Sequence, residues 1–199
     1  VEFALPTDQL SLRARLAAGS FGSYEGQFSV RGPVANGIKL GLSGTYAQSD
    51  GYGTNLFNGA QVYGYDVQNI RGSAVLDPSD RLQISVPITA DNQRVALFGN
   101  PVLGIDKYAN NFPSFNTVTR FNASVEATYE ADGFDIVGLA GYNFSKNISD
   151  SDTDGGDQVR VVRPQIFNHT ENRYRGKQAE LRISSTGIDS LDLDAGVFY

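Results

Sequence analysis

The stretch of sequence that decides the fold is TRFNASVEATYEADGFDIVGLAGYNFSK, which runs from Thr119 to Lys146. Apolar and polar residues alternate along both of its halves, so that one side of each half is apolar. Side chains alternate between the two faces of a β-strand, and this pattern therefore predicts two amphipathic strands. Between them, Asp132 and Gly133 supply the positive φ that a tight reversal requires. The result is a predicted β-hairpin whose arms, about 10 residues each, are long enough for a tilted strand to cross a bilayer.

The same alternation of apolar and polar residues recurs throughout the chain. It predicts seven further strands, at Gln9 to Ala18, Tyr24 to Arg31, Ile38 to Tyr46, Ile70 to Leu76, Leu82 to Ala90, Gln178 to Ser184 and Leu191 to Tyr199. Together with the hairpin, these make nine strands. A bulge is expected at Pro87, because proline removes a donor from the hydrogen-bond ladder. The sequence therefore predicts an all-β protein built as an antiparallel up-and-down meander.

The predicted connections alternate between short and long. Short turns are expected near 35–37, 78–80, 131–133 and 186–190, and longer loops near 49–66, 91–118 and 147–175, with 19–23 as a short member of the second set. Alternate connections of a meander lie at the same end of the sheet, so one end has tight turns and the other carries the loops. Outer-membrane barrels have this asymmetry, with short periplasmic turns and long extracellular loops.

Composition narrows the classes of function. The net charge of −6 and the pI of about 4.7 argue against a nucleic-acid partner, because such a partner requires a basic face. The chain has no cysteine and a single histidine, His169, so neither a thiolate nor a multi-histidine metal site is expected. No nucleophilic triad or phosphate-binding loop emerges, and we expect neither an enzyme nor a cofactor. No apolar run approaches 18 residues, which predicts that no helix crosses a membrane.

The two ends of the chain indicate an excerpt. The chain contains no methionine and opens at Val1 without a signal sequence. Its last residues, LDLDAGVFY, have the pattern of a strand that is interrupted midway. We therefore expect residues 1–199 to form one partial domain of a larger protein.

An apolar face along nearly every strand is compatible with two architectures. In a soluble sandwich this face meets a second sheet, whereas in a membrane barrel it meets lipid and the polar face lines a wet lumen. Strand length, loop asymmetry and aromatic residues near strand ends (Tyr46, Tyr129, Phe134 and Phe144) favour the barrel. Two alternatives stay open, a passive porin-type barrel without a plug and a soluble all-β binding module.

Three stretches of the chain resemble the TonB-dependent outer-membrane receptors. They are GSFGSYEGQFSVRGPVANGIKLGLSGTYAQSDGY at 19–52, IRGSAVLDPSDRLQIS at 70–85 and QAELRISSTGIDSLDLDAGVFY at 178–199. The first is similar to the opening strands of the family's barrel, the second to its fourth and fifth strands, and the third to a later hairpin. The stretches occur in the family's order. Tryptophan, which the family often carries in the third stretch, is absent here.

The resemblance implies a location and a mechanism. The chain would be an open segment of a transmembrane barrel of about 22 strands in the Gram-negative outer membrane, with a plug domain before Val1. Such receptors import a scarce small-molecule ligand, of the siderophore, vitamin or carbohydrate class, and the TonB complex supplies energy through the plug's TonB box. The implied partners are outer-membrane lipid, the plug, the TonB complex and the ligand. The sheet should be curved and open, with unpaired edges at the strands near Leu10 and Val197.

The strand pattern also assigns side chains to the two faces. In the hairpin, Phe121, Val125, Tyr129, Phe134 and Ile136 are predicted to face lipid, and Asp135 is predicted to face the lumen. Eight further charged residues are predicted to face the lumen: Arg13, Arg15, Arg31, Lys39, Arg71, Glu126, Glu180 and Arg182. One interpretation is that they contact the plug or guide an anionic ligand. The interpretation that we favour is that a wet lumen is polar and its charges pair with each other.

The predicted long loops contain aromatic residues and one acidic motif. Contacts to a ligand at the outer mouth are expected from Tyr52, Phe57, Tyr63, Tyr65, Tyr108, Phe112 and Phe115, although loops that fold onto themselves use the same residues. Asp150, Asp152 and Asp154 give the first half of a calcium-loop pattern. The twelfth position is Val161 rather than the bidentate glutamate of such loops, so a solvated acidic loop is the preferred interpretation.

Overall fold

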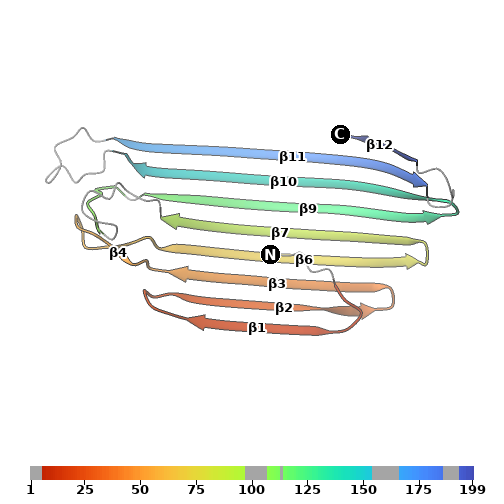
Figure 1. The fold of residues 1–199 in the computed structure, drawn as a ribbon, viewed down its shortest axis with the longest axis horizontal. Helices are drawn as coiled ribbons and strands as arrows, with labels where there is room; N and C mark the ends of the chain where they lie inside the picture. Colours follow the sequence, from red (N-terminus) through yellow and green to blue (C-terminus); the bar gives the residue numbers. More distant parts are fainter. Residues whose placement is uncertain (1–5, 97–106, 113, 154–165, 186–192) are drawn as a thin grey trace.

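The computed structural model describes residues 6–96, 107–112, 114–153, 166–185 and 193–199. Its main element is a nine-stranded antiparallel sheet in the order β1-β2-β3-β6-β7-β9-β10-β11-β12 (Figure 1). The strands are β1 (Ser11–Ala18), β2 (Tyr24–Ala35), β3 (Ile38–Ser49), β6 (Tyr65–Ser79), β7 (Leu82–Ala96), β9 (Phe115–Ala131), β10 (Phe134–Asp152), β11 (Phe167–Ser185) and β12 (Asp194–Phe198). Every strand pairs with its neighbour in the meander, which confirms the predicted all-β fold class. Within the described residues, no helix has the length and apolarity that a membrane crossing requires.

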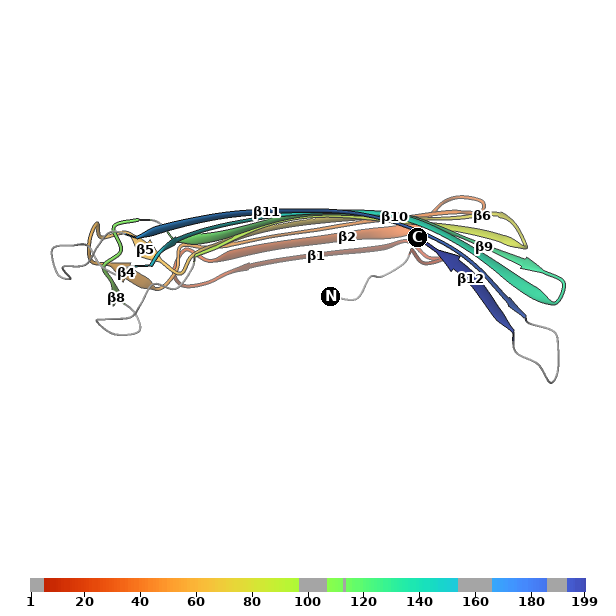
Figure 2. The same ribbon diagram turned by 90° about the horizontal axis from the view of Figure 1, so that it is seen from above.

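The main sheet is a single curved layer. Seen from the side in Figure 2, the strands lie in one thickness, and the later strands bend away at the turn end. The sheet is open, with β1 and β12 as its two outer strands. The predicted open sheet with edges at these two strands is therefore confirmed.

The short turns gather at one end of the sheet and the longer connections at the other (Figure 1). Two-residue turns occupy 36–37, 80–81 and 132–133, so the second turn lies slightly later than predicted. Gly37 and Gly133 have φ values of 70° and 88°, in the left-handed region that glycine adopts without strain. At Gly37, a Cβ would also lie only 2.6 Å from the carbonyl oxygen of Asp77. The predicted turn at 186–190 lies outside the described residues.

Most strands extend further toward the loop end than the sequence predicted. β9 begins at Phe115 and β10 continues to Asp152, in stretches that were predicted to be loop. β11 likewise begins at Phe167 rather than near Gln178. Alternation marks a strand only where one face is apolar, whereas a backbone ladder continues with polar residues on both faces. The extensions of β10 and β11 are mostly polar on both faces, and this is why the pattern missed them.

The predicted bulge at Pro87 is wrong. Ser85 pairs with Glu126 and Ile88 with Ala123 in one continuous register, so β7 passes the proline without a shift. Pro87 still lies opposite Ser73 of β6. The register shifts lie instead beside Pro33 in β2 and between Leu76 and Ser79 in β6, near the turn end. The alternating faces on both sides of Pro87 hold the register, because a slip of one residue would move every side chain to the opposite face.

The described residues contain almost no hydrophobic core. Val75 and Ala109 are the buried apolar residues among them, at 6% and 7% exposure. Large apolar side chains are instead exposed along the sheet. A soluble sandwich would cover such a face with a second sheet, and the described residues provide no such layer. Among the described residues, these apolar side chains are therefore not covered by a second layer.

Candidate functional site

One face of the main sheet carries a continuous apolar surface. Directly paired residues of antiparallel strands share a face, so the register assigns each side chain. The large, exposed apolar side chains on this apolar face are Leu12, Leu16, Phe28, Leu40, Leu42, Ile70, Ile88, Phe121, Val125, Tyr129, Phe134, Tyr142, Leu181, Ile183 and Val197. From Phe121 to Tyr129 the surface extends about 26 Å along the strand. These residues number nine, and a tilted strand needs about 9–11 residues to cross the apolar part of a bilayer.

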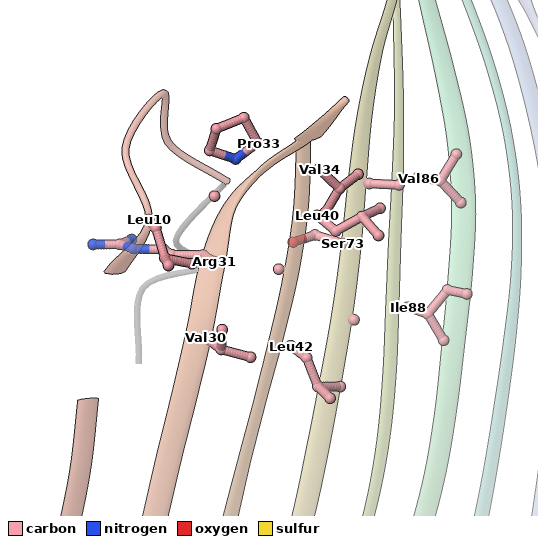
Figure 3. Close-up of a pocket in the computed structure, with 14 residues that line it drawn as sticks. Leu10, Val30, Arg31, Pro33, Val34, Leu40, Leu42, Ser73, Val86 and Ile88 are labelled. Atoms are coloured by element: carbon pink, nitrogen blue, oxygen red, sulfur yellow. The ribbon is translucent and has the colours of Figure 1, made fainter. Parts of the chain in front are cut away.

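The apolar face includes a groove near the turn end (Figure 3). Val30, Leu42 and Ile88 lie in one row with Gly72, where no side chain fills the space. A Cβ at Gly72 would meet no atom within 4 Å, so the row dips at that position. The groove has a volume of about 450 Å³, and its chemistry suits hydrocarbon rather than a polar ligand.

Aromatic residues border the apolar face at both ends. At the loop end, the rings of Tyr24 and Tyr46 lie 5.7 Å apart. The hydroxyls of both donate to Gln48 Oε1, at 2.5 and 2.9 Å, and the Tyr46 hydroxyl also lies 3.0 Å from Asp66 Oδ2. At the turn end, Tyr129 and Phe134 are exposed. An apolar band between two aromatic borders is the pattern of a barrel surface that crosses a bilayer.

The opposite face, which we call the polar face, carries the residues that were predicted to face the lumen. Strand register places all eight of them on it: Arg13, Arg15, Arg31, Lys39, Arg71, Glu126, Glu180 and Arg182. Asp135 shares this face through its pairing with Ser184. The face is not wholly polar, because Val75, Val137 and Leu139 also lie on it toward the turn end.

Four arginines on the polar face line a single hollow. Arg13 and Arg15 of β1, Arg31 of β2 and Arg71 of β6 surround a volume of about 1100 Å³. Arg13 and Arg71 lie in the same row, separated by Ser29 and Ser43. Polar side chains of Gln27, Asn69 and Gln93 complete the wall. The N-terminal strands therefore present a basic hollow on their polar face.

The charges of the polar face pair with each other only in part. Lys39 Nζ lies 2.7 Å from Asp8 Oδ1 and 3.6 Å from Asp77 Oδ2, near the turn end. Arg120 lies 3.3 Å from Asp91. Among the described residues, no carboxylate lies within 4.0 Å of Arg13, Arg15 or Arg31. Mutual pairing, the interpretation favoured from the sequence, therefore describes Lys39 but not these arginines.

The loops at the other end fold onto each other. β4 (Gly53–Asn55), β5 (Gln61–Val62) and β8 (Lys107–Tyr108) form a small sheet, in which β4 and β8 pair in parallel. The Asn55 side chain donates to the carbonyl oxygen of Asn110 at 2.8 Å, and both residues are buried. Sequence reasoning missed this loop cap, because its strands have two or three residues and no alternation.

Asp152 ties the end of β10 to the loop cap. Its side chain is buried at 6% residue exposure, and its Oδ2 accepts hydrogen bonds from the backbone amides of Asn111, at 3.2 Å, and Phe112, at 3.4 Å. Asp150 points elsewhere, with Oδ1 2.5 Å from Nδ1 of His169. Asp150 and Asp152, two of the three aspartates of the calcium-loop pattern, therefore have separate protein partners. Asp154 lies outside the described residues.

Some of the aromatic residues that were predicted to be ligand contacts lie in the loops or in the small loop sheet, and the others lie in main-sheet strands. Tyr52 and Phe57 lie in the loops and are about half exposed, at 53% and 49%. The Tyr52 ring stacks on Tyr63 at 4.8 Å between centroids. Phe112 packs at 5.4 Å from Phe167, and Tyr108 lies in β8.

Tyr65 and Phe115 were wrongly predicted to lie in loops. Both lie in main-sheet strands, β6 and β9, because those strands continue toward the loops beyond the large apolar side chains of the apolar face. Phe115 shares its face with Phe121, and the Arg94 guanidinium lies 4.0 Å from the centroid of its ring. Tyr65 nevertheless remains 40% exposed, whereas Phe115 is half-buried.

Solved structures identify the class of fold. The chain superimposes on the ferric yersiniabactin uptake receptor FyuA of Yersinia pestis with a TM-score of 0.72 and 17% identity, covering 98% of this chain and 31% of that one. It matches the ferric-catecholate import receptor Fiu of E. coli K12, closed form, with a TM-score of 0.71 and 13% identity, over 98% and 32% of the two chains. The siderophore receptor PirA of Acinetobacter baumannii gives a TM-score of 0.67 at 14% identity, over 98% and 30%.

These matches confirm the resemblance at the level of the fold. The chain has the fold of an open barrel segment of TonB-dependent siderophore receptors, and it spans about a third of the length of the receptors it matches. No family model and no curated protein sequence matches the chain.

Proposed function

We propose that residues 1–199 are part of the barrel domain of a TonB-dependent receptor in the Gram-negative outer membrane. The observation that carries the proposal is the single-layer meander with an uncovered apolar face, which superimposes on receptor barrels over nearly the whole chain. In this setting the apolar face contacts lipid and the polar face lines the lumen. The extra strands that close the barrel, the plug domain and its TonB box belong to the rest of the receptor.

The proposed activity is energised uptake of a ferric siderophore. Among the ligand classes that the family resemblance implies, the siderophore class is favoured because the three matched structures are named as ferric yersiniabactin, ferric-catecholate and siderophore receptors. Binding begins at the loop end, where Tyr52 and Phe57 are exposed and the loop cap holds the loops in place. The TonB complex acts on the plug, which contacts the polar face. The role is transport rather than catalysis.

A gene deletion tests the function directly. Cells that lack the full-length gene should lose growth on at least one ferric siderophore from a panel under iron limitation, and the restored gene should recover it. A protonophore should stop uptake of the corresponding radiolabelled iron complex, because TonB draws on the energised inner membrane. Uptake that continues in the presence of the protonophore would favour the passive porin. Full-length protein that fractionates with the soluble proteins would contradict both membrane functions.

The basic hollow offers a second test of the polar face as a lumen surface. Arg13, Arg15 and Arg31 have no carboxylate partner among the described residues, and we propose that they receive an acidic surface of the plug or an anionic ligand. The double variant Arg13→Glu/Arg15→Glu should lower uptake by roughly tenfold or more, because reversal of charge converts attraction into repulsion at close range. Initial uptake rates of the radiolabelled complex would measure the effect.

The matched control for this charge reversal is Arg81→Glu. Arg81 lies in the 80–81 turn, with a salt bridge of 2.9 Å to the exposed Asp132, and it is distant from the hollow along β6. This variant should transport at the wild-type rate. Unchanged uptake in the double variant, with normal amounts in the outer membrane, would mean that the arginines serve only to keep the lumen polar.

A further inference from the structure

A row of cations interrupts the apolar face on β11. Arg173, Arg175 and Lys177 share that face with Leu181 and Ile183, because all occupy alternate positions of one strand. Lys146 of β10 lies directly opposite Arg173. We call Lys146, Arg173, Arg175 and Lys177 the basic row. Since Glu180 and Arg182 point to the other face, the basic row is on the outer surface and not in the lumen.

The basic row lies where the apolar belt ends toward the loops. Phe144 is the direct partner of Arg175, and Tyr142 is the direct partner of Lys177. Across the strands, the paired residues Ile70, Ala90, Phe121 and Phe144 are apolar, and the next residue in the same line is Arg175. Such rows cross the membrane obliquely in a barrel, because its strands are tilted. The long stems of Arg175 and Lys177 can therefore follow apolar neighbours while their charges reach the bilayer interface. The Arg175 guanidinium lies 6.0 Å from the centroid of the Phe144 ring.

Acidic groups neutralise only part of the basic row. Glu171, on the same face, lies 2.5 Å from Arg173 and 3.3 Å from Lys146. Asp150, further toward the loops, pairs with His169. Within the described part of the chain, no carboxylate lies within 4.0 Å of Arg175 or Lys177. The row therefore keeps a net positive charge on a surface that is otherwise apolar.

We propose that the basic row binds the phosphates of a lipid headgroup in the outer leaflet. This inference rests on the proposed membrane location, in which the loop end is extracellular. A cation on a lipid-facing surface is costly unless it meets an anion at the interface, and arginine binds phosphate through paired hydrogen bonds. The apolar residues below the row, Ala179, Leu181 and Ile183, would contact the acyl chains of the same lipid.

The test measures binding of lipid A, a diphosphorylated glycolipid, to the full-length receptor. Detergent-purified protein is titrated with lipid A in mixed micelles, and native mass spectrometry measures the bound fraction. The triple variant Arg173→Gln/Arg175→Gln/Lys177→Gln should bind about 100-fold more weakly, because each basic residue near an anionic surface contributes roughly a fivefold gain. Dephosphorylated lipid A should bind wild-type protein as weakly as lipid A binds the triple variant.

Two further variants separate charge from structure. Arg173→Lys/Arg175→Lys keeps the positive charges and should retain most of the affinity. The triple variant Arg81→Gln/Arg120→Gln/Arg182→Gln removes the same charge from the turn end and the polar face, and it should bind lipid A as the wild type does. Equal lipid A binding by wild type and by the basic-row triple variant would overturn the proposal, and so would equal binding of dephosphorylated lipid A.

Membrane fractionation keeps this result separate from the proposed function. A basic-row variant that remains in the outer membrane, transports its ligand and binds lipid A normally overturns the lipid site alone. Wild-type protein that is absent from the outer membrane overturns the proposed function and the lipid site together.

Discussion

Replacement of Val125 by arginine is expected to destabilise the full-length protein in a lipid bilayer by about 2–4 kcal/mol. Val125 is exposed on the apolar face, opposite Ala140 of β10 and between Ala123 and Ala127. It lies near the middle of the apolar face, where the described residues directly beside it, Ala123, Ala127 and Ala140, have no polar side chain to receive a guanidinium. Urea titration of protein folded into phosphatidylcholine vesicles, followed by tyrosine fluorescence, would measure the change in the free energy of unfolding.

The neighbouring residue provides the matched control for Val125→Arg. Ser124 lies on the polar face beside a hollow that Asn122 and Gln178 also line, and Glu126 on the same face offers a counter-charge. Ser124→Arg should therefore change the free energy of unfolding by less than about 1 kcal/mol. Similar effects at both positions would contradict the assignment of the apolar face to lipid.

Replacement of Asp152 by alanine is expected to loosen the loop cap. Asp152 is buried, and the change removes the carboxylate that accepts from two half-buried backbone amides, those of Asn111 and Phe112. A buried donor without a partner costs about 1–3 kcal/mol, which corresponds to roughly 10–100-fold faster hydrogen exchange through local opening. Hydrogen exchange of the 107–114 segment in the full-length protein, followed by mass spectrometry, would measure it.

Two variants isolate this role of Asp152. Asp152→Asn keeps a side-chain acceptor and should preserve most of the protection. Asp150→Ala removes a carboxylate two residues away that contacts His169 rather than the loop cap, so the exchange of 107–114 should stay at the wild-type rate. Equal exchange rates in all four proteins would show that Asp152 does not hold the loop cap. A ligand that protects the same segment in the wild type would link the loop cap to uptake.

The sequence predicted the amphipathic part of the strands well and their extensions poorly. Phe121 to Tyr129 and Phe134 to Phe144 lie in β9 and β10 with the faces that their alternation indicated. Beyond Phe144, β10 carries polar residues on both faces apart from Ile148, and too little periodicity remains to distinguish strand from loop. Pro87 misled for the opposite reason, because a local rule about one missing donor was weaker than the register held by the flanking residues.

For the sites, too, the sequence predicted what depends on nearby residues but not what depends on residues far apart in the chain. Arg13, Arg15, Arg31 and Arg71 could be placed on one face by counting in steps of two along each strand. Their convergence on one hollow depends on which residues lie opposite each other across strands, and only the register supplies it. The loop-cap contacts of Asn55, Asn110 and Asp152 had no local signal, because they join segments that are far apart in the chain.

The sequence by itself determined the strands, their two faces and the end of the sheet at which the loops lie. These properties follow from side-chain alternation and from turn chemistry, both of which act within a few residues. Among the described residues, the tertiary structure decided that no second layer covers the apolar face, that Arg13, Arg15 and Arg31 have no carboxylate within 4.0 Å, and that the basic row ends the apolar face on β11. All three properties depend on which residues lie next to each other across the strands. The free-energy cost of an exposed apolar face or an unpaired charge is set by the groups that lie against it, and a single strand does not show those groups.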